Sequence, residues 1–423
     1  MKNKVLFGLL VFVVVVAFLL GACAKPAPAP APTPAPKPAP APAPPVKDAI
    51  VIGMARSYSG PLAPITKFVA EPIIDMWLDE VNARGGIYVA EYGKKLPVKY
   101  IKYDDKSDRG TMVKLMEKLV IEDKVDLLFG PTGTGMLFAA VPVANKLEAI
   151  LLPMEGGAAS LKTMISEFPW AFTLITTGDV QGPVLADVCV ELGMKTVAMT
   201  YCEDLHGYEY RDSVVPAFVA RGIDVVMLES HPLGIKDLSP VLKKAKGLKV
   251  DVFYCASYPA ENYLATKQAI ELDFNPKVFA MNVGGCWNSF RDMFGANVVE
   301  GVIAVGAFSE KSGPGVKEFR DKFIARYGEG ACEHWGHICY WVMFQHFENC
   351  VDKAGTLDPE KLRDVLATET SDTAWGPFRW VNGVVPTELY CGQMGQWLKG
   401  MYEVIGPGAK RTATPIIKPP WPK

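Results

Sequence analysis

The sequence has no excess of charge of either sign and lacks the short motifs of several enzyme classes. Its 423 residues include 44 Lys and Arg against 46 Asp and Glu, a formal net charge of −2. Because basic residues are not in excess, the composition does not indicate a positively charged surface for nucleic acid, and we expect no nucleic-acid partner. The chain also contains no Gly-x-Ser-x-Gly sequence, no phosphate-binding loop and no paired-cysteine motif. Hydrolase and nucleotide chemistry are therefore disfavoured.

Cysteines are few and are not arranged in pairs. The chain has 9 of them, and those that follow Cys23 are scattered along it. In an exported protein some of these could form disulfides, but the spacing does not say which. Cys332 and Cys339 lie two turns apart on an expected helix, so we do not expect them to bridge each other.

What the N-terminal region does contain is a charged end followed by an apolar run. Lys2 and Lys4 precede VLFGLLVFVVVVAFLL, which is shorter than the about 20 residues of a membrane-spanning helix and is typical of a secretory signal. The tetrapeptide LGAC that ends at Cys23 resembles a bacterial lipobox. This resemblance implies cleavage before Cys23 and attachment of lipid to it. The alternative is an ordinary signal peptide, or a transmembrane anchor, with a chance cysteine.

Proline and alanine dominate the residues that follow Cys23. Because proline fixes φ and donates no hydrogen bond, this stretch favours an extended, polyproline-like form without a core. At about 3.1 Å per residue it would reach roughly 70 Å. Several acyl chains on one terminus anchor a protein stably where a single chain does not. We therefore expect a tether to a membrane.

From Asp48 onward, short apolar runs alternate with helical patterns. Residues 49–55, AIVIGMA, predict a buried strand, and EPIIDMWLDEVNARGG predicts a helix with Trp77 on its core stripe. The same pattern predicts helices at residues 111–122, 135–147, 182–192, 208–221, 238–246, 260–272, 316–327, 334–354 and 359–366, and short β-like pieces in GPFRWV and GQWLKGMYEVI. Strands separated by helices of this length predict βαβ units and parallel sheets, and so many strands favour two α/β lobes over one.

An ordered series of short motifs covers nearly all of residues 49–407. It consists of GMARSYSGPLAP, EVNARGGI, YIKYDDKSD, KLVIEDKVDLLFGPTGTG, FTLITTGDVQG, YCEDLHGYEYRD, VARGIDVV and GPFRW…GQWLKGMYEVI. This series resembles the type I periplasmic binding proteins, specifically the branched-chain amino acid (Leu/Ile/Val)-binding proteins of ABC importers. The resemblance implies an α/β fold of two Rossmann-like lobes with parallel central sheets flanked by helices, joined by three crossing strands. Ligand would bind between the lobes, at the carboxyl ends of strands.

The resemblance also implies a division of the chain. It places the crossings near Phe172, Phe308 and residues 373–375. The expected parts are a signal peptide at 1–22, a lipidated cysteine and tether at 23–47, an N-terminal lobe at 48–172 plus 309–373, a C-terminal lobe at 173–308 plus 374–407, and a tail at 408–423.

The stretch FGPTGTGM ends a strand and opens a helix. Its glycines let the backbone approach a ligand closely, and the free N–H groups of a helix start favour an anion. The resemblance implies that the hydroxyl and amide of Thr134 hold a ligand carboxylate, with Thr132 and Gly133 beside it. The alternative is that Thr134 merely caps its own helix.

The stretch LPMEGGAAS departs from the family pattern. There the resemblance implies a backbone carbonyl, at Glu155, and a threonine hydroxyl for a ligand ammonium. After Gly156, however, Gly157 stands where the threonine would be. The stretch AMNVGGCWNSF, in which the acid of the second lobe is expected, contains Asn282 but no Asp or Glu. A buried ammonium without partners is bound poorly. The side chain of Glu155 could substitute for them or could point to solvent.

Four aromatic residues follow expected strand ends and could form a wall of the site. Tyr58, Tyr208, Tyr258 and Trp287 each have core or surface packing as the alternative. Together they predict a ligand with a flat or apolar body and a carboxylate head, either an amino acid or an aromatic or other organic acid.

The expected function is therefore that of an extracytoplasmic solute-binding lipoprotein, in the periplasm or at the cell surface. It would carry no cofactor and would deliver its ligand to an ABC permease by hinge closure. A ligand-sensing module of the same fold is the alternative, but no carboxyl-terminal transmembrane helix or output domain follows Lys423, which favours the expectation of transport. A metal enzyme using His334, His337 and His346 is disfavoured, because no acidic third ligand stands at a suitable spacing.

Overall fold

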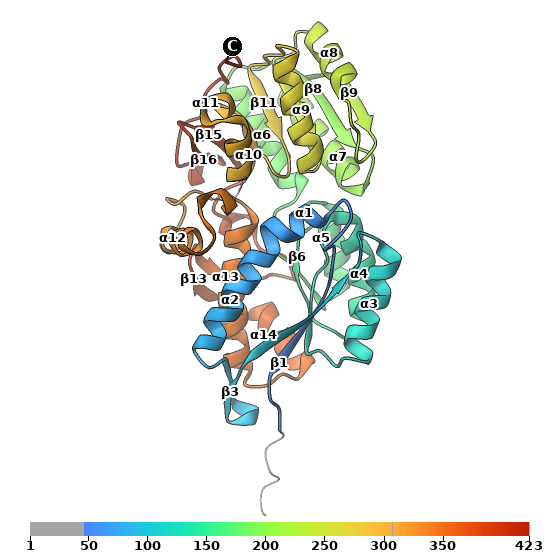
Figure 1. The fold of residues 1–423 in the computed structure, drawn as a ribbon, viewed down its shortest axis with the longest axis vertical. Coiled ribbons are helices and arrows are strands. Elements are labelled where there is room, and N and C mark those ends of the chain that lie inside the picture. Colours follow the sequence, from blue (N-terminus) through green and yellow to red (C-terminus); the bar gives the residue numbers. More distant parts are fainter. Residues whose placement is uncertain (1–45, 307, 423) are drawn as a thin grey trace, which may run out of the picture. The chain divides into compact units, whose positions relative to one another are not determined.

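The computed structural model describes residues 46–306 and 308–422, which belong to one compact unit (Figure 1). The predicted signal peptide, Cys23 and nearly all of the predicted tether lie outside the described residues. Among the residues that are described, no helix combines the length and the apolar character needed to cross a bilayer.

The first sheet is wholly parallel, with the strand order β4-β1-β5-β6-β7. Its strand β1 is buried along almost its whole length, as expected for a parallel strand whose two faces are both covered. We call this sheet and its helices the first lobe. Its elements are β1 (Ile50–Arg56), α1 (Ala63–Ile65), the π-helical η2 (Thr66–Ala70), α2 (Glu71–Ala83), β4 (Val98–Asp104), α3 (Arg109–Ile121), β5 (Leu127–Phe129), α4 (Thr134–Lys146), β6 (Leu151–Met154), α5 (Ser160–Glu167) and β7 (Ala171–Thr173).

The second sheet has seven strands in the order β16-β15-β12-β11-β10-β8-β9. We call it, with its helices, the second lobe. Its elements are α6 (Gly178–Glu191), β8 (Thr196–Cys202), α7 (Leu205–Val219), β9 (Asp224–His231), α8 (Ser239–Gly247), β10 (Val252–Ala256), α9 (Pro259–Glu271), β11 (Val278–Met281), α10 (Asn288–Phe294), α11 (Ala296–Val299), β12 (Ile303–Val305), β15 (Met394–Leu398) and β16 (Met401–Gly406).

The expected parallel strands are present in the second sheet, but two antiparallel strands extend it. Strands β15 and β16 form a hairpin in which Leu398 pairs with Met401. The two residues between them, Lys399 and Gly400, both have positive φ, which is the conformation that tight two-residue hairpins require. The apolar pattern alone did not reveal that β15 runs antiparallel to both of its neighbours, β12 and β16.

The C-terminal helices return to the first lobe. They are α12 (Val316–Tyr327), α13 (Gly336–Ala354) and α14 (Pro359–Thr368), after which β13 (Ser371–Thr373) and β14 (Gly376–Phe378) pair. Helix α13 packs against α2 and β2 (Ile87–Val89). The chain thus passes between the sheets after β7, after β12 and after β14. The predicted lobe bounds at residues 172, 308 and 373 stay predictions.

Most of the predicted helices are confirmed, α12 at the same residues. Short elements were missed: the hairpin of β2 and β3 (Lys94–Leu96), α5, and the single turn η4 (Glu329–Ala331). Each is too short to show a period of its own. Helix α6 begins at Gly178, four residues before its predicted start, and contains Pro183.

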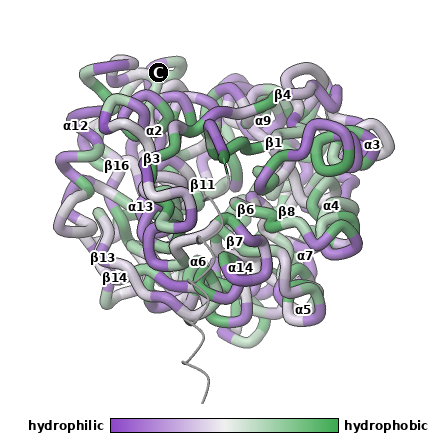
Figure 2. Tube along the Cα trace, turned by 90° about the horizontal axis from the view of Figure 1, so that it is seen from below, coloured by the Kyte–Doolittle hydropathy of each residue, from purple (hydrophilic) through white to green (hydrophobic). Residues whose placement is uncertain are grey.

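The prediction that Trp77 is a core residue is confirmed. Its side chain is buried and its ring stacks on that of Phe344, with the ring centroids 4.2 Å apart. Its indole N–H donates to Glu348 at 2.8 Å. Figure 2 shows hydrophobic segments, in green, along strands such as β6 and β8, and hydrophilic segments, in purple, along outer helices such as α14.

The possibility of disulfides is not realised in the described part of the chain. The cysteines there are all buried and free: Cys189, Cys202, Cys255, Cys286, Cys332, Cys339, Cys350 and Cys391. They lie among the apolar side chains of the core, where a thiol packs as a small hydrophobic group. Cys332 and Cys339 do not bridge each other, as expected.

Candidate ligand-binding site

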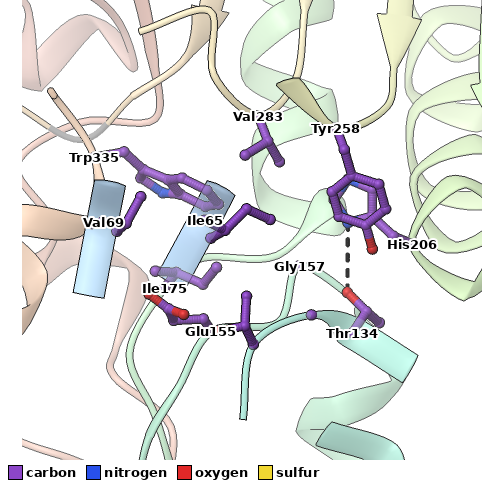
Figure 3. Close-up of a pocket in the computed structure, with 13 residues that line it drawn as sticks. Ile65, Val69, Thr134, Glu155, Gly157, Ile175, His206, Tyr258, Val283 and Trp335 are labelled. Carbon is purple, nitrogen blue, oxygen red and sulfur yellow. Dashed lines mark hydrogen bonds between the residues drawn. The ribbon is translucent and has the colours of Figure 1, made fainter. Parts of the chain in front are cut away.

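A pocket lies between the two lobes, at the carboxyl ends of strands and the N-termini of helices. The gaps between its lining atoms amount to about 430 Å³, with the solvent at its open mouth included. The first lobe and the adjoining segments contribute Ile65, Val69, Thr132, Gly133, Thr134, Glu155, Gly157, Ile175, Trp335 and Gly336, and the second lobe contributes His206, Tyr258 and Val283 (Figure 3). Most of this lining is apolar, with a few polar groups among it, as in sites for small organic ligands.

Six of the eleven residues predicted to bind ligand line this pocket. They are Thr132, Gly133, Thr134, Glu155, Gly157 and Tyr258. They come from loops that follow β5 and β6 of the first sheet and β10 of the second. The fold brings these loops together because the carboxyl ends of strands from both sheets border the space between the lobes.

The other five predicted residues do not line the pocket. Tyr208 is 38 % exposed and packs against the Arg211 guanidinium. Trp287 is buried and stacks on Phe68, and the Asn282 side chain is buried with its amide 3.4 Å from the Tyr254 hydroxyl. The remaining two are Tyr58, whose ring lies 5.9 Å from the Lys102 ammonium, and Gly156, which packs against Leu137 and Leu161.

The N-terminus of α4 has no cap of its own and opens into the pocket. Gly133 precedes the helix with φ 97° and ψ 144°, a conformation open almost only to glycine, and offers no side chain for capping. Thr134 is the first helical residue, so the alternative that Thr134 caps its own helix is wrong. Among the described residues, the N–H groups of Thr134 and Gly135 have no acceptor. Together with the helix dipole, these groups favour an anion.

The N-terminus of α13 borders the same pocket but is already occupied. The carboxylate of Glu333 is buried and accepts hydrogen bonds from the backbone N–H groups of Trp335, at 2.8 Å, and Gly336, at 3.0 Å. It also accepts from the N–H of His337. The end of α13 is therefore neutralised by the chain's own carboxylate, whereas the end of α4 is left for a ligand.

A buried ion pair forms one side of the pocket. An oxygen of Glu155 lies 2.5 Å from Nη2 of Arg56, whose side chain is fully buried. Arg56 also donates to the hydroxyls of Thr132, at 2.7 Å, and Tyr340, at 2.9 Å, and to the carbonyl of Gly130, at 2.8 Å. Burial opposes its charge, but Tyr340 and Glu155 outweigh this and raise the pKa of Arg56 above its ordinary value.

This pairing answers the question left open for Glu155. Its side chain neither points to solvent nor stands free as an anion, because it is paired with Arg56. Arg56 was missed from the sequence. The available signal was a single arginine that ends the otherwise apolar strand IVIGMAR, and a charge there needs a partner.

The second missed residue is His206, which reaches the pocket from α7. Its ring stacks on Tyr258 with centroids 4.8 Å apart, and its Nδ1 lies 3.5 Å from the Thr134 hydroxyl (Figure 3). Its Nε2 has no partner among the described residues. Burial lowers the pKa of His206 to about 4 in spite of the nearby Asp204 carboxylate, so the imidazole is neutral near pH 7.

Helix geometry explains why His206 faces the pocket and Tyr208 does not. His206 and Tyr210 are four residues apart, so both lie on the buried face of α7, with ring centroids 4.7 Å apart. Tyr208 lies two residues along and faces the other way. The ring of LHGYEY that reaches the pocket is thus that of His206, two residues before the predicted Tyr208.

The three histidines considered as metal ligands have separate partners. His334 is bonded to Asn288 at 3.0 Å, His337 to the Phe68 carbonyl at 2.8 Å, and His346 to the Ser371 hydroxyl at 2.7 Å. Within the described part of the chain, no cluster of three or more His, Cys, Asp or Glu side chains could hold a metal ion.

Two α/β lobes with a pocket at their strand ends define a type I periplasmic binding protein fold. The chain belongs to the periplasmic binding protein family, whose model matches residues 49–396. A curated relative is the leucine-, isoleucine-, valine-, threonine- and alanine-binding protein of Pseudomonas aeruginosa. It is 24 % identical over 332 residues, which cover 78 % of this chain and 85 % of the relative.

Solved structures show the same fold. The branched-chain amino acid transporter substrate-binding protein LivJ of Streptococcus pneumoniae, in complex with isoleucine, matches with a TM-score of 0.73 and 19 % identity, covering 88 % of this chain and 100 % of LivJ. An ABC transporter solute-binding protein of Rhodopseudomonas palustris, in complex with benzoate, matches with a TM-score of 0.70 and 18 % identity, covering 84 % of this chain and 94 % of that protein.

Proposed function

We propose that this protein is the extracytoplasmic solute-binding component of an ABC importer and that it captures a small carboxylate between its lobes. The observation that carries the proposal is the open N-terminus of α4, where Thr134, whose N–H has no acceptor among the described residues, lines a largely apolar pocket. Among similar structures, one holds an amino acid and another an aromatic acid. Both ligands carry a carboxylate.

Capture needs no bond chemistry, only closure of one lobe on the other. Ligand that contacts both lobes favours the closed form over the open one. Three contacts link the lobes in this structure: Thr134 meets His206, Phe68 stacks on Trp287, and the Asn288 N–H donates to the Cys332 carbonyl at 2.9 Å. The permease would then recognise the closed form.

The proposal includes a lipid anchor on Cys23 and a proline-rich tether that keep the protein at the outer face of a membrane. Several acyl chains supply stable attachment, and an extended tether lets the two lobes reach a permease. The protein acts without a cofactor and without turnover of its ligand.

The direct test is calorimetric titration of the full-length protein in detergent with small carboxylates, both amino acids and organic acids. We expect saturable binding of at least one, and a loss of about tenfold or more in affinity in Thr134→Ala, which disturbs the α4 end. Chemical turnover of a carboxylate, or failure of every carboxylate to bind, would contradict the proposal.

A further inference from the structure

We infer that the pocket selects organic acids that carry no ammonium group, and that His206 is the residue that determines this selectivity. The inference rests on the proposed carboxylate site and narrows its ligand class. It concerns the difference between an amino acid and the same molecule without its α-ammonium group.

Among the described residues, the pocket lining offers no carboxylate whose charge is free to balance a buried ammonium. Glu155 is the one carboxylate among the lining residues, and its charge is paired with Arg56 at 2.5 Å. The Thr132 hydroxyl accepts from Arg56 at 2.7 Å and shares a hydrogen bond with Thr66 at 2.9 Å. An ammonium that approached either group would compete with an existing bond of a buried cation.

The carboxylates just behind the pocket wall are engaged as well. Asp204 accepts from the Tyr258 hydroxyl and from the Gly207 N–H, both at 2.9 Å. Glu333 is held by the N-terminus of α13. The open end of α4 adds positive potential, which repels an ammonium and attracts an anion.

At Gly157 the chain also lacks the hydroxyl that could accept a hydrogen bond from an ammonium. A Cβ at this position would meet the ring and hydroxyl of Tyr210 at 2.6 to 2.7 Å, so no hydroxyl-bearing side chain fits there. The Tyr210 hydroxyl itself donates to Gln181 at 2.6 Å, and the Gly157 carbonyl accepts from the Gly178 N–H at 2.8 Å. The loop after β6 therefore presents mainly backbone and a tyrosine ring.

His206, in contrast, offers the pocket a buried hydrogen-bond donor that needs an acceptor. We assign to the neutral ring the tautomer in which Nδ1 accepts from the Thr134 hydroxyl, 3.5 Å away, and Nε2 carries the hydrogen. This Nε2 is buried and has no partner in the described residues. A buried donor without a partner is costly, and a carboxylate oxygen would satisfy it. An ammonium cannot, because it accepts no hydrogen bond.

The remaining lining suits an apolar body. Ile65, Val69, Ile175 and Val283 are aliphatic, and the Trp335 and Tyr258 rings stand on two sides (Figure 3). These groups gain by burying hydrocarbon and cannot compensate charge. The expected ligands are aliphatic or aromatic monocarboxylates.

Matched ligand pairs test the inference by calorimetry on the full-length protein. 3-Phenylpropanoate is compared with phenylalanine, and 4-methylpentanoate with leucine, since each pair differs only in the α-ammonium group. We expect the acids to bind about tenfold or more tightly than their amino acid partners. Equal or tighter binding of an amino acid overturns the inference and leaves the carboxylate site standing. Binding of neither kind overturns the inference, and failure of every other small carboxylate as well would overturn the proposed function.

Variants of His206 test its role. His206→Phe keeps a stacking ring and loses the donor, whereas His206→Gln keeps a donor. We expect His206→Phe to lose about tenfold or more in affinity for the acids, and His206→Gln to retain most of it. Tyr208→Phe, at the exposed position outside the pocket, is the matched control and should bind as the unaltered protein does. If His206→Phe binds acids unchanged, His206 does not determine selectivity.

Discussion

Glu155 and Arg56 are 99 positions apart in the chain, yet their side chains meet at 2.5 Å in a pair that is almost closed to solvent. The pair sits at the ends of two strands of the first sheet, β1 and β6. It neutralises the one acidic side chain that lines the pocket, and its hydrogen bonds hold Thr132 at the pocket wall.

Breaking this pair from one side is expected to be costly. Arg56→Met leaves Glu155 buried without its partner and should lower the free energy of unfolding by about 3–5 kcal/mol. Urea denaturation measures this value. The control is the double variant Arg56→Met, Glu155→Leu, which removes both charges and should recover most of the loss. A single variant as stable as the unaltered protein would show that the pair is solvated.

The backbone of Gly133 gives a second prediction. Gly133→Ala forces a side chain onto φ 97° and brings its Cβ to 2.9 Å from Leu62. We expect a loss of about 1–3 kcal/mol in the free energy of unfolding and weaker binding of acids, because the α4 end is displaced. Gly135→Ala is the control, since its Cβ meets nothing within 4 Å. Equal effects of the two substitutions would contradict the prediction.

Buried histidines predict how stability depends on pH. Burial lowers the pKa of both His206 and His346 to about 4, below the about 6.5 of an exposed histidine. Between these values the unfolded chain binds more protons than the folded one, so the free energy of unfolding falls as pH drops from about 6.5 to 4. Above about pH 6.5 this contribution is complete.

Urea denaturation across that pH range checks the histidine prediction. His206→Phe should flatten the fall by up to about 3 kcal/mol, the free-energy equivalent of its pKa shift. His346 still contributes in the variant, so part of the fall should persist. A variant with the same pH dependence as the unaltered protein would mean that His206 titrates normally in the fold.

The cysteines predict a protein without disulfides in its folded part. Burial raises the pKa of thiols such as Cys189 and Cys332, so they should not react with a thiol reagent in the native state. Unfolding in denaturant without a reductant should expose them all. Measurement of the intact mass under these conditions provides the check. A mass below that of the fully reduced chain by two hydrogen atoms per bridge, or thiols that stay unreactive after unfolding, would reveal disulfides.

The lipid anchor predicts a change of location. Cys23→Ser should move the protein from the membrane fraction to the soluble fraction, because the acyl chains have no attachment point. Mass spectrometry of the mature N-terminus checks the modification directly. Retention of Cys23→Ser in the membrane would favour an uncleaved apolar anchor instead.

The order of strands and helices could be predicted from the sequence because it is a local property. Apolar runs and helical periodicity need only neighbouring residues, which is why α12 was placed at its observed bounds and Trp77 in the core. The loops that carry Thr134 and Gly157 were found for the same reason, since each follows an apolar strand.

The tertiary structure alone decided what each side chain in those loops meets. The pairing of Glu155 with Arg56, the ring of Tyr210 over Gly157 and the choice of His206 over Tyr208 as the residue facing the pocket all depend on segments far apart in the chain. Local pattern carries no information about such distant partners. The sequence by itself therefore determined where a site lies, and the packing of two lobes determined its charge and its open hydrogen-bond donors.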